Sequence, residues 1–217
     1  MLQSLKLFIG LGFAALTAIG ADAQDAKAKE ILDEISNRTR QYSTITSDFS
    51  FQLEDKIGGV NQTQAGSLKM KGKKYQIVIG ANTIYSDGTT RWTYNKDLNE
   101  VYIDQANLGG DDLNPSEIYT VWETGFKSYY EKEMSVGGKN LHVIKLVPVK
   151  PADKTYHTVR VYIDKEKMEV AKIEILGKQG DNYTYTVKTF QPNQTYAENI
   201  FVFDKTKHSG VEIIDNR

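Results

Sequence analysis

The chain has 217 residues, of which 40% are hydrophobic and 25% charged, an ordinary composition for one globular domain. Its formal net charge of −1 and its pI of about 6.3 provide no basic field for binding nucleic acid. The absence of cysteine excludes disulfide scaffolds, thiol nucleophiles and thiolate metal sites.

The first residues are predicted to be a signal peptide. Lys6 precedes an apolar run from Leu7 to Ala18, which is too short to cross a bilayer comfortably. Ala21-Asp22-Ala23 has the small-x-small pattern of a cleavage site. We therefore expect cleavage after Ala23, with residues 1–23 removed and an exported domain of residues 24–217 remaining. An uncleaved anchor is the alternative, and the lack of a basic flank after the apolar run disfavours it.

An amphipathic helix is predicted directly after the cleavage site, with Asp25 in position to cap it. Its apolar stripe consists of Ala28, Ile31, Leu32 and Ile35. Most of the remaining chain alternates between apolar and polar residues, which predicts strands with one buried face. The predicted strand cores are 49–54, 66–74, 75–79, 92–94, 101–103, 141–147, 159–163, 170–176 and 183–190, with short closing segments at 201–203 and 211–213.

A second helix is predicted after a polar loop. Asn114-Pro115-Ser116-Glu117 combines a capping residue, a proline at the first helical position and a glutamate at the third. Ile118, Val121 and Trp122 would form its apolar stripe. The fold class expected from these elements is mainly β with α. We predict an open antiparallel half-barrel of about ten to eleven strands, with a helical lid over its concave apolar face.

No catalytic or metal-binding pattern is present in the sequence. The three histidines, His142, His157 and His208, are not at metal-ligand spacing, and the first two are expected to be satisfied polar residues on strands. There is no P-loop, no G-x-S-x-G elbow and no H-E-x-x-H motif. We therefore expect no enzyme activity, no cofactor and no metal.

One basic cluster allows two interpretations; it consists of Lys69, Lys71, Lys73 and Lys74. Lysines on a solvated edge discourage unwanted strand pairing. Alternatively, the cluster is a docking site for an acidic partner or an anionic lipid head group. A bulge at Gly72 would interrupt the shared face of these lysines.

Residues 86–95, SDGTTRWTYN, resemble the SDG-x-x-x-W-x-Y-N signature of the LolA family, the periplasmic outer-membrane lipoprotein carriers. The surroundings agree in order. A first helix is followed by Ser47-Asp48-Phe49, then by Gly66-x-Leu68-x-x-Lys71 ahead of Tyr75, and later by the helix that starts at Pro115. The resemblance covers roughly residues 26–203.

The resemblance implies a periplasmic carrier. Family members accept acylated lipoproteins from an inner-membrane ABC transporter and deliver them to an outer-membrane acceptor, often a lipoprotein of the same fold. We expect a monomer that binds no nucleic acid. A periplasmic lipid- or lipoprotein-sensing adaptor of the same fold, acting in envelope-stress signalling, remains the alternative.

On this expectation the acyl chains contact inward-facing residues of the strands and the lid. Ordinary core packing is the alternative for each of these residues. The expected lining consists of Phe49, Phe51, Tyr75, Ile77, Ile79, Trp92, Tyr94, Ile118, Val121 and Trp122.

Overall fold

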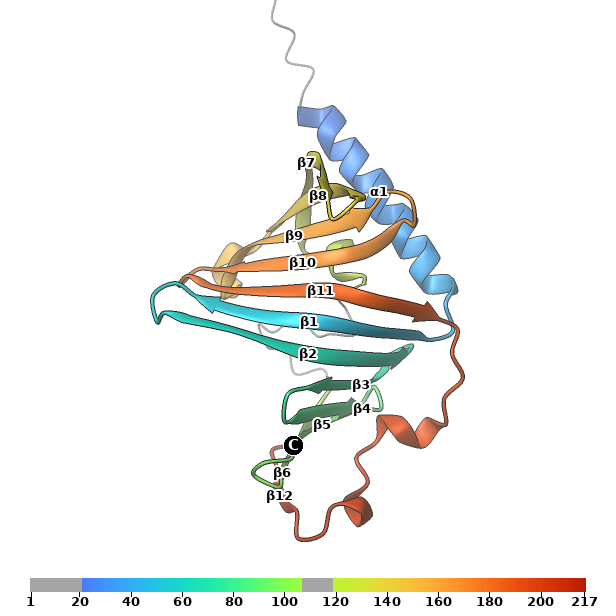
Figure 1. The fold of residues 1–217 in the computed structure, drawn as a ribbon, viewed down its shortest axis with the longest axis vertical. Helices are drawn as coiled ribbons and strands as arrows, with labels where there is room; N and C mark the ends of the chain where they lie inside the picture. Colours follow the sequence, from blue (N-terminus) through green and yellow to red (C-terminus); the bar gives the residue numbers. More distant parts are fainter. Residues whose placement is uncertain (1–20, 107–118) are drawn as a thin grey trace, which may run out of the picture.

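The fold consists of one curved sheet, one long helix and several short 3-10 helices (Figure 1). The computed structural model describes residues 21–106 and 119–217. The helix is α1 (Ala21–Gln41). The strands are β1 (Ile45–Asp55), β2 (Val60–Lys71), β3 (Lys74–Ile79), β4 (Asn82–Ser86), β5 (Thr90–Asn95), β6 (Glu100–Gln105), β7 (Phe126–Val136), β8 (Lys139–Pro148), β9 (Tyr156–Asp164), β10 (Glu169–Gly177), β11 (Asp181–Pro192) and β12 (Glu212–Asp215). The 3-10 helices are η2 (Val121–Glu123), η3 (Pro151–Asp153), η4 (Glu198–Phe201) and η5 (Lys205–Lys207).

The strands form a single sheet in the order β12-β6-β5-β4-β3-β2-β1-β11-β10-β9-β8-β7. Neighbouring strands are antiparallel, except that β12 pairs in parallel with β6. Strands β7 and β12 lie at the two ends of this order, so the sheet stays open. The predicted open half-barrel with a helical cover is confirmed, with twelve described strands instead of ten or eleven.

The two halves of the sheet meet where β1 pairs with β11. Phe51 lies opposite Tyr185 in this pair, although the two residues are far apart in the sequence. One half then continues through the hairpins from β2 to β6, and the other through the hairpins from β7 to β11.

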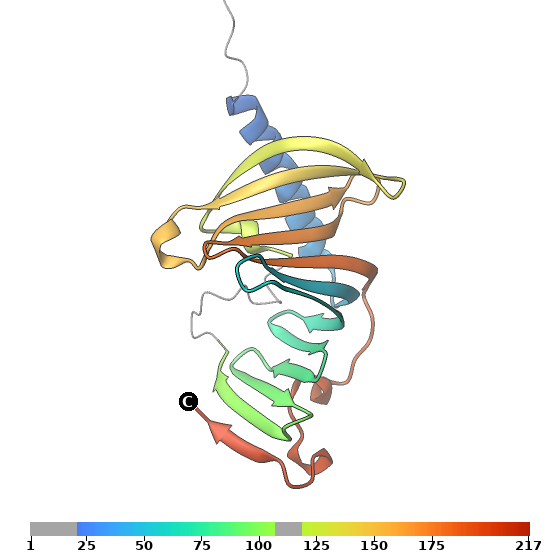
Figure 2. The same ribbon diagram turned by 60° about the vertical axis from the view of Figure 1, so that its left-hand side comes forward.

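Helix α1 lies on the concave face of the sheet, and β7 and β8 arch over it (Figure 2). The predicted stripe is buried against the main core: Ala28, Ile31, Leu32 and Ile35 are each at most 7% exposed. Asp25 does not cap this helix, because α1 already begins at Ala21. The proline-started helix and Ile118 fall outside the described residues.

Several local features of the sheet differ from the sequence prediction, and β4 was not predicted at all. Strand β7 was not predicted, because a bulge between Tyr130 and Lys132 breaks its alternation. Gly72, with a φ of 57°, and Lys73 form the turn between β2 and β3, so residues 66–74 are not one strand. Phe201 lies in the short helix η4 instead of a closing strand.

The signature segment begins with a side-chain-stabilised turn. The Asp87 carboxylate accepts hydrogen bonds from the backbone N–H groups of Thr89 and Thr90, both at 2.8 Å. The Ser86 hydroxyl accepts one from the Gly88 N–H at 3.1 Å. Gly88 has a φ of 92°, a conformation that favours glycine, so each residue of the Ser-Asp-Gly triplet is explained by the turn into β5.

Candidate functional site

The concave face of the sheet carries the main apolar core, which α1 and the residues just before and within η2 cover. We call α1 together with residues 119–123 the lid. Beneath the lid lies a small apolar cavity of about 30 Å³. Such a volume holds about one or two water molecules. Its lining consists of Ser47, Phe49, Leu68, Ile77, Ile79, Tyr119, Tyr185 and Val187.

Phe49 reaches the cavity because the facing residue has no side chain. Gly66 lies opposite Phe49 in the pairing of β1 with β2. A Cβ atom at Gly66 would lie 2.5 Å from the Phe49 Cζ and 3.0 Å from the carbonyl oxygen of Val78. Gly66 therefore provides the space in which the Phe49 ring lies across the sheet.

Polar contacts attach η2 to the helix of the lid. The indole N–H of Trp122 donates a buried hydrogen bond to the Ser36 hydroxyl at 2.8 Å. The Arg40 guanidinium lies 2.8 Å from the Glu123 carboxylate. Val121 and Trp122 are 8% and 7% exposed and belong to the main core. The two parts of the lid are therefore joined by one buried hydrogen bond, one surface ion pair and apolar packing.

Tyr119 is the lid residue that lines the cavity. Burial raises the pKa of its hydroxyl, while a side-chain hydrogen bond with Ser47 acts in the opposite direction. Its ring centroid lies 5.8 Å from that of Phe190 on β11. Tyr119 thus contacts β1 and β11, where the two halves of the sheet meet.

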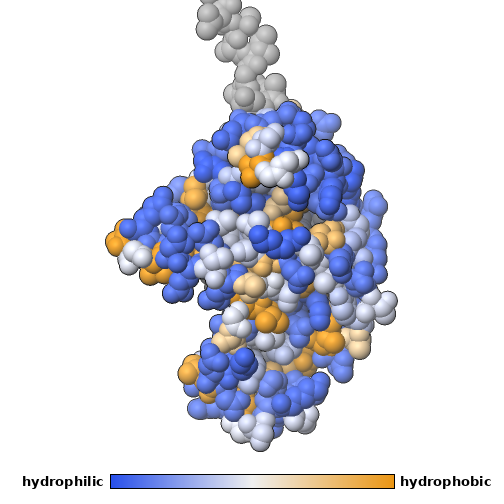
Figure 3. All heavy atoms as spheres, in the orientation of Figure 1, coloured by the Kyte–Doolittle hydropathy of each residue, from blue (hydrophilic) through white to orange (hydrophobic). Residues whose placement is uncertain are grey.

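A row of aromatic rings continues from the cavity along β1 and β11. Phe49 lies 5.9 Å from Tyr185, and Phe51 lies 5.0 Å from Tyr185 and 6.1 Å from Tyr183 (ring centroids). All four rings are half-buried. Figure 3 shows that the molecule is hollowed below the projecting ends of these strands, with apolar residues at the margin of the hollow.

The described lining of the cavity contains no Asp, Glu, Lys, Arg or His side chain. Apart from the hydroxyls of Ser47 and Tyr119, the lining side chains are apolar, and such a surface attracts hydrocarbon by the hydrophobic effect. Within residues 21–106 and 119–217, no group of His, Asp and Glu is arranged to hold a metal ion.

The structure brings together only part of the lining expected from the sequence. Tyr75, Ile77, Val121 and Trp122 are buried in the main core, and Ile79 and Phe49 are packed against it. Phe51 joins the aromatic row. Ile118 lies outside the described residues.

Trp92 and Tyr94 were expected in the lining, and the structure places them on the opposite face of the sheet. Thr93 pairs with Ile84, and Ile84 pairs with Ile77, which is buried in the main core on the concave side. Thr93 therefore faces the concave side, and its neighbours Trp92 and Tyr94 face the other side. Trp92 and Tyr94 pack instead in a second apolar cluster with Phe203 and Val101.

The second cluster is covered by residues 193–217, which we call the C-terminal segment. The Phe203 ring lies 5.4 Å from Tyr94 and stacks on His208 at 4.8 Å with an interplanar angle of 17°. His208 also lies 4.2 Å from Tyr94. The aromatic residues of the signature therefore hold the C-terminal segment in place.

Most of the lysine cluster also contacts the C-terminal segment. The ammonium groups of Lys71 and Lys74 both pair with the Glu198 carboxylate, the latter at 2.6 Å. The ammonium group of Lys69 lies 5.5 Å from the ring centroid of Tyr196. These contacts give three of the four lysines a partner within the chain.

Sequence reasoning missed five residues of the cavity: Ser47, Leu68, Tyr119, Tyr185 and Val187. The alternation that predicts β11 also places Tyr185 and Val187 on one face. No local signal indicates that β11 pairs with β1, so only the folded chain brings these residues to the cavity.

No described helix has both the length and the apolar character needed to span a membrane. The fold resembles that of solved bacterial proteins. An uncharacterised conserved protein from Thermus thermophilus has a TM-score of 0.59 at 11% identity, covering 88% of this chain and 99% of that one. A DUF1329 family protein from Desulfovibrio piger has a TM-score of 0.50 at 11% identity, covering 87% of this chain and 99% of that one.

Sequence comparison identifies the family. An outer-membrane lipoprotein carrier protein from Hahella chejuensis is 26% identical over 217 residues, which cover 97% of this chain and 98% of that protein. Residues 40–204 match the family described as "Outer membrane lipoprotein carrier protein LolA". This match spans most of the chain, including the cavity, the aromatic row and η2. The chain therefore belongs to the LolA family.

Proposed function

We propose that the protein is a periplasmic carrier that binds the acyl chains of lipoproteins released from the inner membrane and delivers them to the outer membrane. The observation that carries this proposal is the uncharged apolar cavity beneath a lid whose two parts are joined by one buried hydrogen bond and one ion pair. Membership in a family of carriers supports it, and makes the chain a binding protein rather than an enzyme.

The energetics of acyl chains explain why such a carrier needs an apolar site. Each buried CH₂ group contributes about 0.8 kcal/mol, so chains with about thirty such groups would cost more than about 20 kcal/mol to expose to water. Burial in protein has to replace burial in the membrane. The cavity of about 30 Å³ is far too small for a chain of that length, so uptake requires the lid to move and the apolar surface beneath it to widen.

Two partners follow from the proposed transport route. An inner-membrane ABC transporter would supply the lipoprotein, and an outer-membrane acceptor would receive it. The predicted signal peptide supports a periplasmic location.

A release assay tests the carrier function. Spheroplasts that synthesise a labelled outer-membrane lipoprotein would receive the purified chain without its predicted signal peptide. We expect a soluble complex in the supernatant that forms only with acylated lipoprotein. A non-acylated version of the same lipoprotein provides the control for cargo.

Two neighbouring residues provide a matched pair of variants. Ile79 lines the cavity, whereas Val78 points to the other face of β3 and is 36% exposed. Ile79→Asp should abolish release, because it places a charge among apolar groups. Val78→Asp should leave it unchanged. Equal release by both folded variants, or release that does not need the acyl chains, would contradict the proposal.

A further inference from the structure

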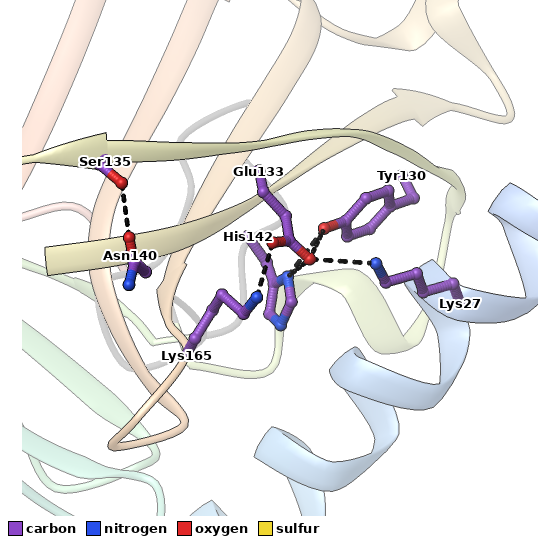
Figure 4. A network of polar contacts seen from close by, with 7 residues as sticks. All are labelled: Lys27, Tyr130, Glu133, Ser135, Asn140, His142 and Lys165. Carbon is purple, nitrogen blue, oxygen red and sulfur yellow. Dashed lines mark hydrogen bonds and ion pairs between the residues drawn. The ribbon is translucent and has the colours of Figure 1, made fainter.

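A polar cluster joins the N-terminal half of α1 to the sheet (Figure 4), and none of its residues lines the cavity. Glu133 on β7 is its centre. Its carboxylate lies 3.3 Å from the Lys27 ammonium group of α1 and 2.6 Å from the Lys165 ammonium group, between β9 and β10. The Lys27 ammonium group also lies 3.9 Å from the ring centroid of Tyr130. Three separate parts of the fold therefore meet at one carboxylate.

His142 lies beside this carboxylate and is 9% exposed. Its Nδ1 lies 2.8 Å from the Tyr130 hydroxyl and 3.7 Å from the Glu133 carboxylate. The Tyr130 hydroxyl has one proton, which it donates to the Glu133 carboxylate at 3.1 Å. We assign His142 the tautomer with a proton on Nδ1, so that the Tyr130 oxygen accepts from it. This assignment leaves Nε2 to take up a proton, and Figure 4 shows that nitrogen pointing away from the other labelled residues.

The two lysine charges near His142 oppose its protonation, whereas the Glu133 carboxylate favours it. The charged groups that act on it are Lys27 from α1, Lys165 from the turn after β9, and Glu133 from β7. On its other neighbouring strand, β9, it faces the apolar Ile163. With neutral His142, two ammonium groups share one carboxylate. A protonated His142 would be a third cation against the same single carboxylate, in a largely buried position.

We propose that Glu133 and His142 form a pH-sensitive latch, which holds the N-terminal half of α1 on the sheet near neutral pH and releases it when His142 takes up a proton. Lys27 is the α1 residue that the latch holds, through Glu133 and the Tyr130 ring. The latch lies at the opposite end of α1 from the Ser36 contact with Trp122, so the two ends of the lid are held independently.

The direction of the pH effect follows from linkage. Burial lowers the pKa of His142 in the closed form, Lys165 and Lys27 lower it further, and Glu133 opposes them. An imidazole that is freed from these surroundings returns toward its ordinary value of about 6.5. Protons therefore favour the open form. Between pH 6.5 and the lowered pKa of the closed form, the ratio of closed to open molecules should fall by up to tenfold for each pH unit.

Spin labels can measure this opening directly, because the chain has no cysteine of its own. Glu30→Cys on α1 and Val136→Cys at the end of β7 provide two exposed label sites. Pulsed EPR should give one short distance at pH 7.5 and a growing longer population toward pH 5. The protein is measured without any acyl ligand.

Two histidine variants form the critical comparison. His142→Gln should abolish the pH response, whereas His157→Gln, at an exposed position on β9, should retain it. A distance distribution in the parent protein that does not change between pH 7.5 and 5 would overturn the latch. A pH response that persists in folded His142→Gln would do the same.

If His142→Gln does not fold, hydrogen exchange of the parent protein tests the latch without any variant. Hydrogen exchange of the α1 amides, corrected for intrinsic pH dependence, should accelerate at pH 5.5 relative to β9. Unchanged relative protection would contradict the latch.

The latch would regulate cargo release only if the proposed carrier function holds. A separate experiment would therefore follow retention of a fluorescent fatty acid at both pH values. Opening of α1 without any fatty acid binding would support the latch and count against the carrier function. Fatty acid binding without a pH response of α1 would support the carrier function and count against the latch.

Discussion

The sheet carries apolar clusters on opposite faces, and each is covered in a different way. On the concave face the cover is the lid, with a buried hydrogen bond, an ion pair and a cavity beneath it. On the other face the C-terminal segment inserts the rings of Phe203 and His208 against Tyr94. The lid therefore leaves space between itself and the sheet, whereas rings packed against Tyr94 hold the C-terminal segment.

Phe203→Ala should have the largest effect on stability. The ring contacts Tyr85, Tyr94 and His208, so its loss leaves a cavity and should lower the free energy of unfolding by about 3 kcal/mol. Urea denaturation measures the change. Fatty acid binding by the folded fraction should remain as in the parent protein, and a loss of binding would show that the two clusters are coupled.

Gly66→Ala should reduce both stability and binding. The new methyl group displaces the Phe49 ring toward the cavity, at a cost of about 1 to 3 kcal/mol. Displacement titration with a fluorescent fatty acid should show weaker binding. The variant Gly66→Ala/Phe49→Leu removes the ring and should regain part of the lost stability, whereas no recovery would argue against this clash.

Ser36→Ala should loosen the lid. The Trp122 N–H would lose its buried acceptor, at a cost of about 1 to 2 kcal/mol to the closed lid. Stopped-flow fluorescence should therefore show faster fatty acid uptake. Asn99→Ala removes the acceptor of the Tyr94 hydroxyl in the second cluster, so it should leave the uptake rate unchanged. Equal rates for Ser36→Ala and the parent protein would contradict this role of the contact.

Glu198→Gln should have the smallest effect, and only its pH dependence is diagnostic. Hydrogen bonds from Lys71 and then Lys74 lower the pKa of Glu198 from 4.5 to about 2. A lowered carboxylate pKa contributes stability above pH 4.5, and this contribution is lost as the pH falls toward 2. The variant should therefore show a flatter decline of the urea midpoint between pH 5 and pH 2.5. A decline as steep as in the parent protein would exclude the contribution.

Local sequence patterns predicted much of the fold. Alternation correctly predicted that Phe49 on β1 and Ile77 on β3 face the core, and helical spacing correctly predicted the buried stripe of α1. The SDGTTRWTYN segment indicated the family, which the comparison confirms. Local patterns succeed here because side-chain direction in a strand or helix depends only on the period of the backbone.

The site could be predicted only in part, since the sequence does not show which strands become neighbours. Trp92 and Tyr94 alternate as clearly as Ile77 and Ile79, yet they face the other side of the sheet. The bulge in β7 concealed a whole strand that carries Glu133. The lysine cluster acquired its partner, Glu198, from a segment more than a hundred residues away.

The sequence by itself determined the mainly β class, the first helix, most strands and the family. Only the tertiary structure decided which strands are neighbours, on which face of the sheet each set of alternating apolar residues lies, and which polar groups hold the lid. The physical reason is that secondary structure is set by contacts within a few residues, whereas the pairing of β1 with β11 and the two covers depend on surfaces distant in the chain.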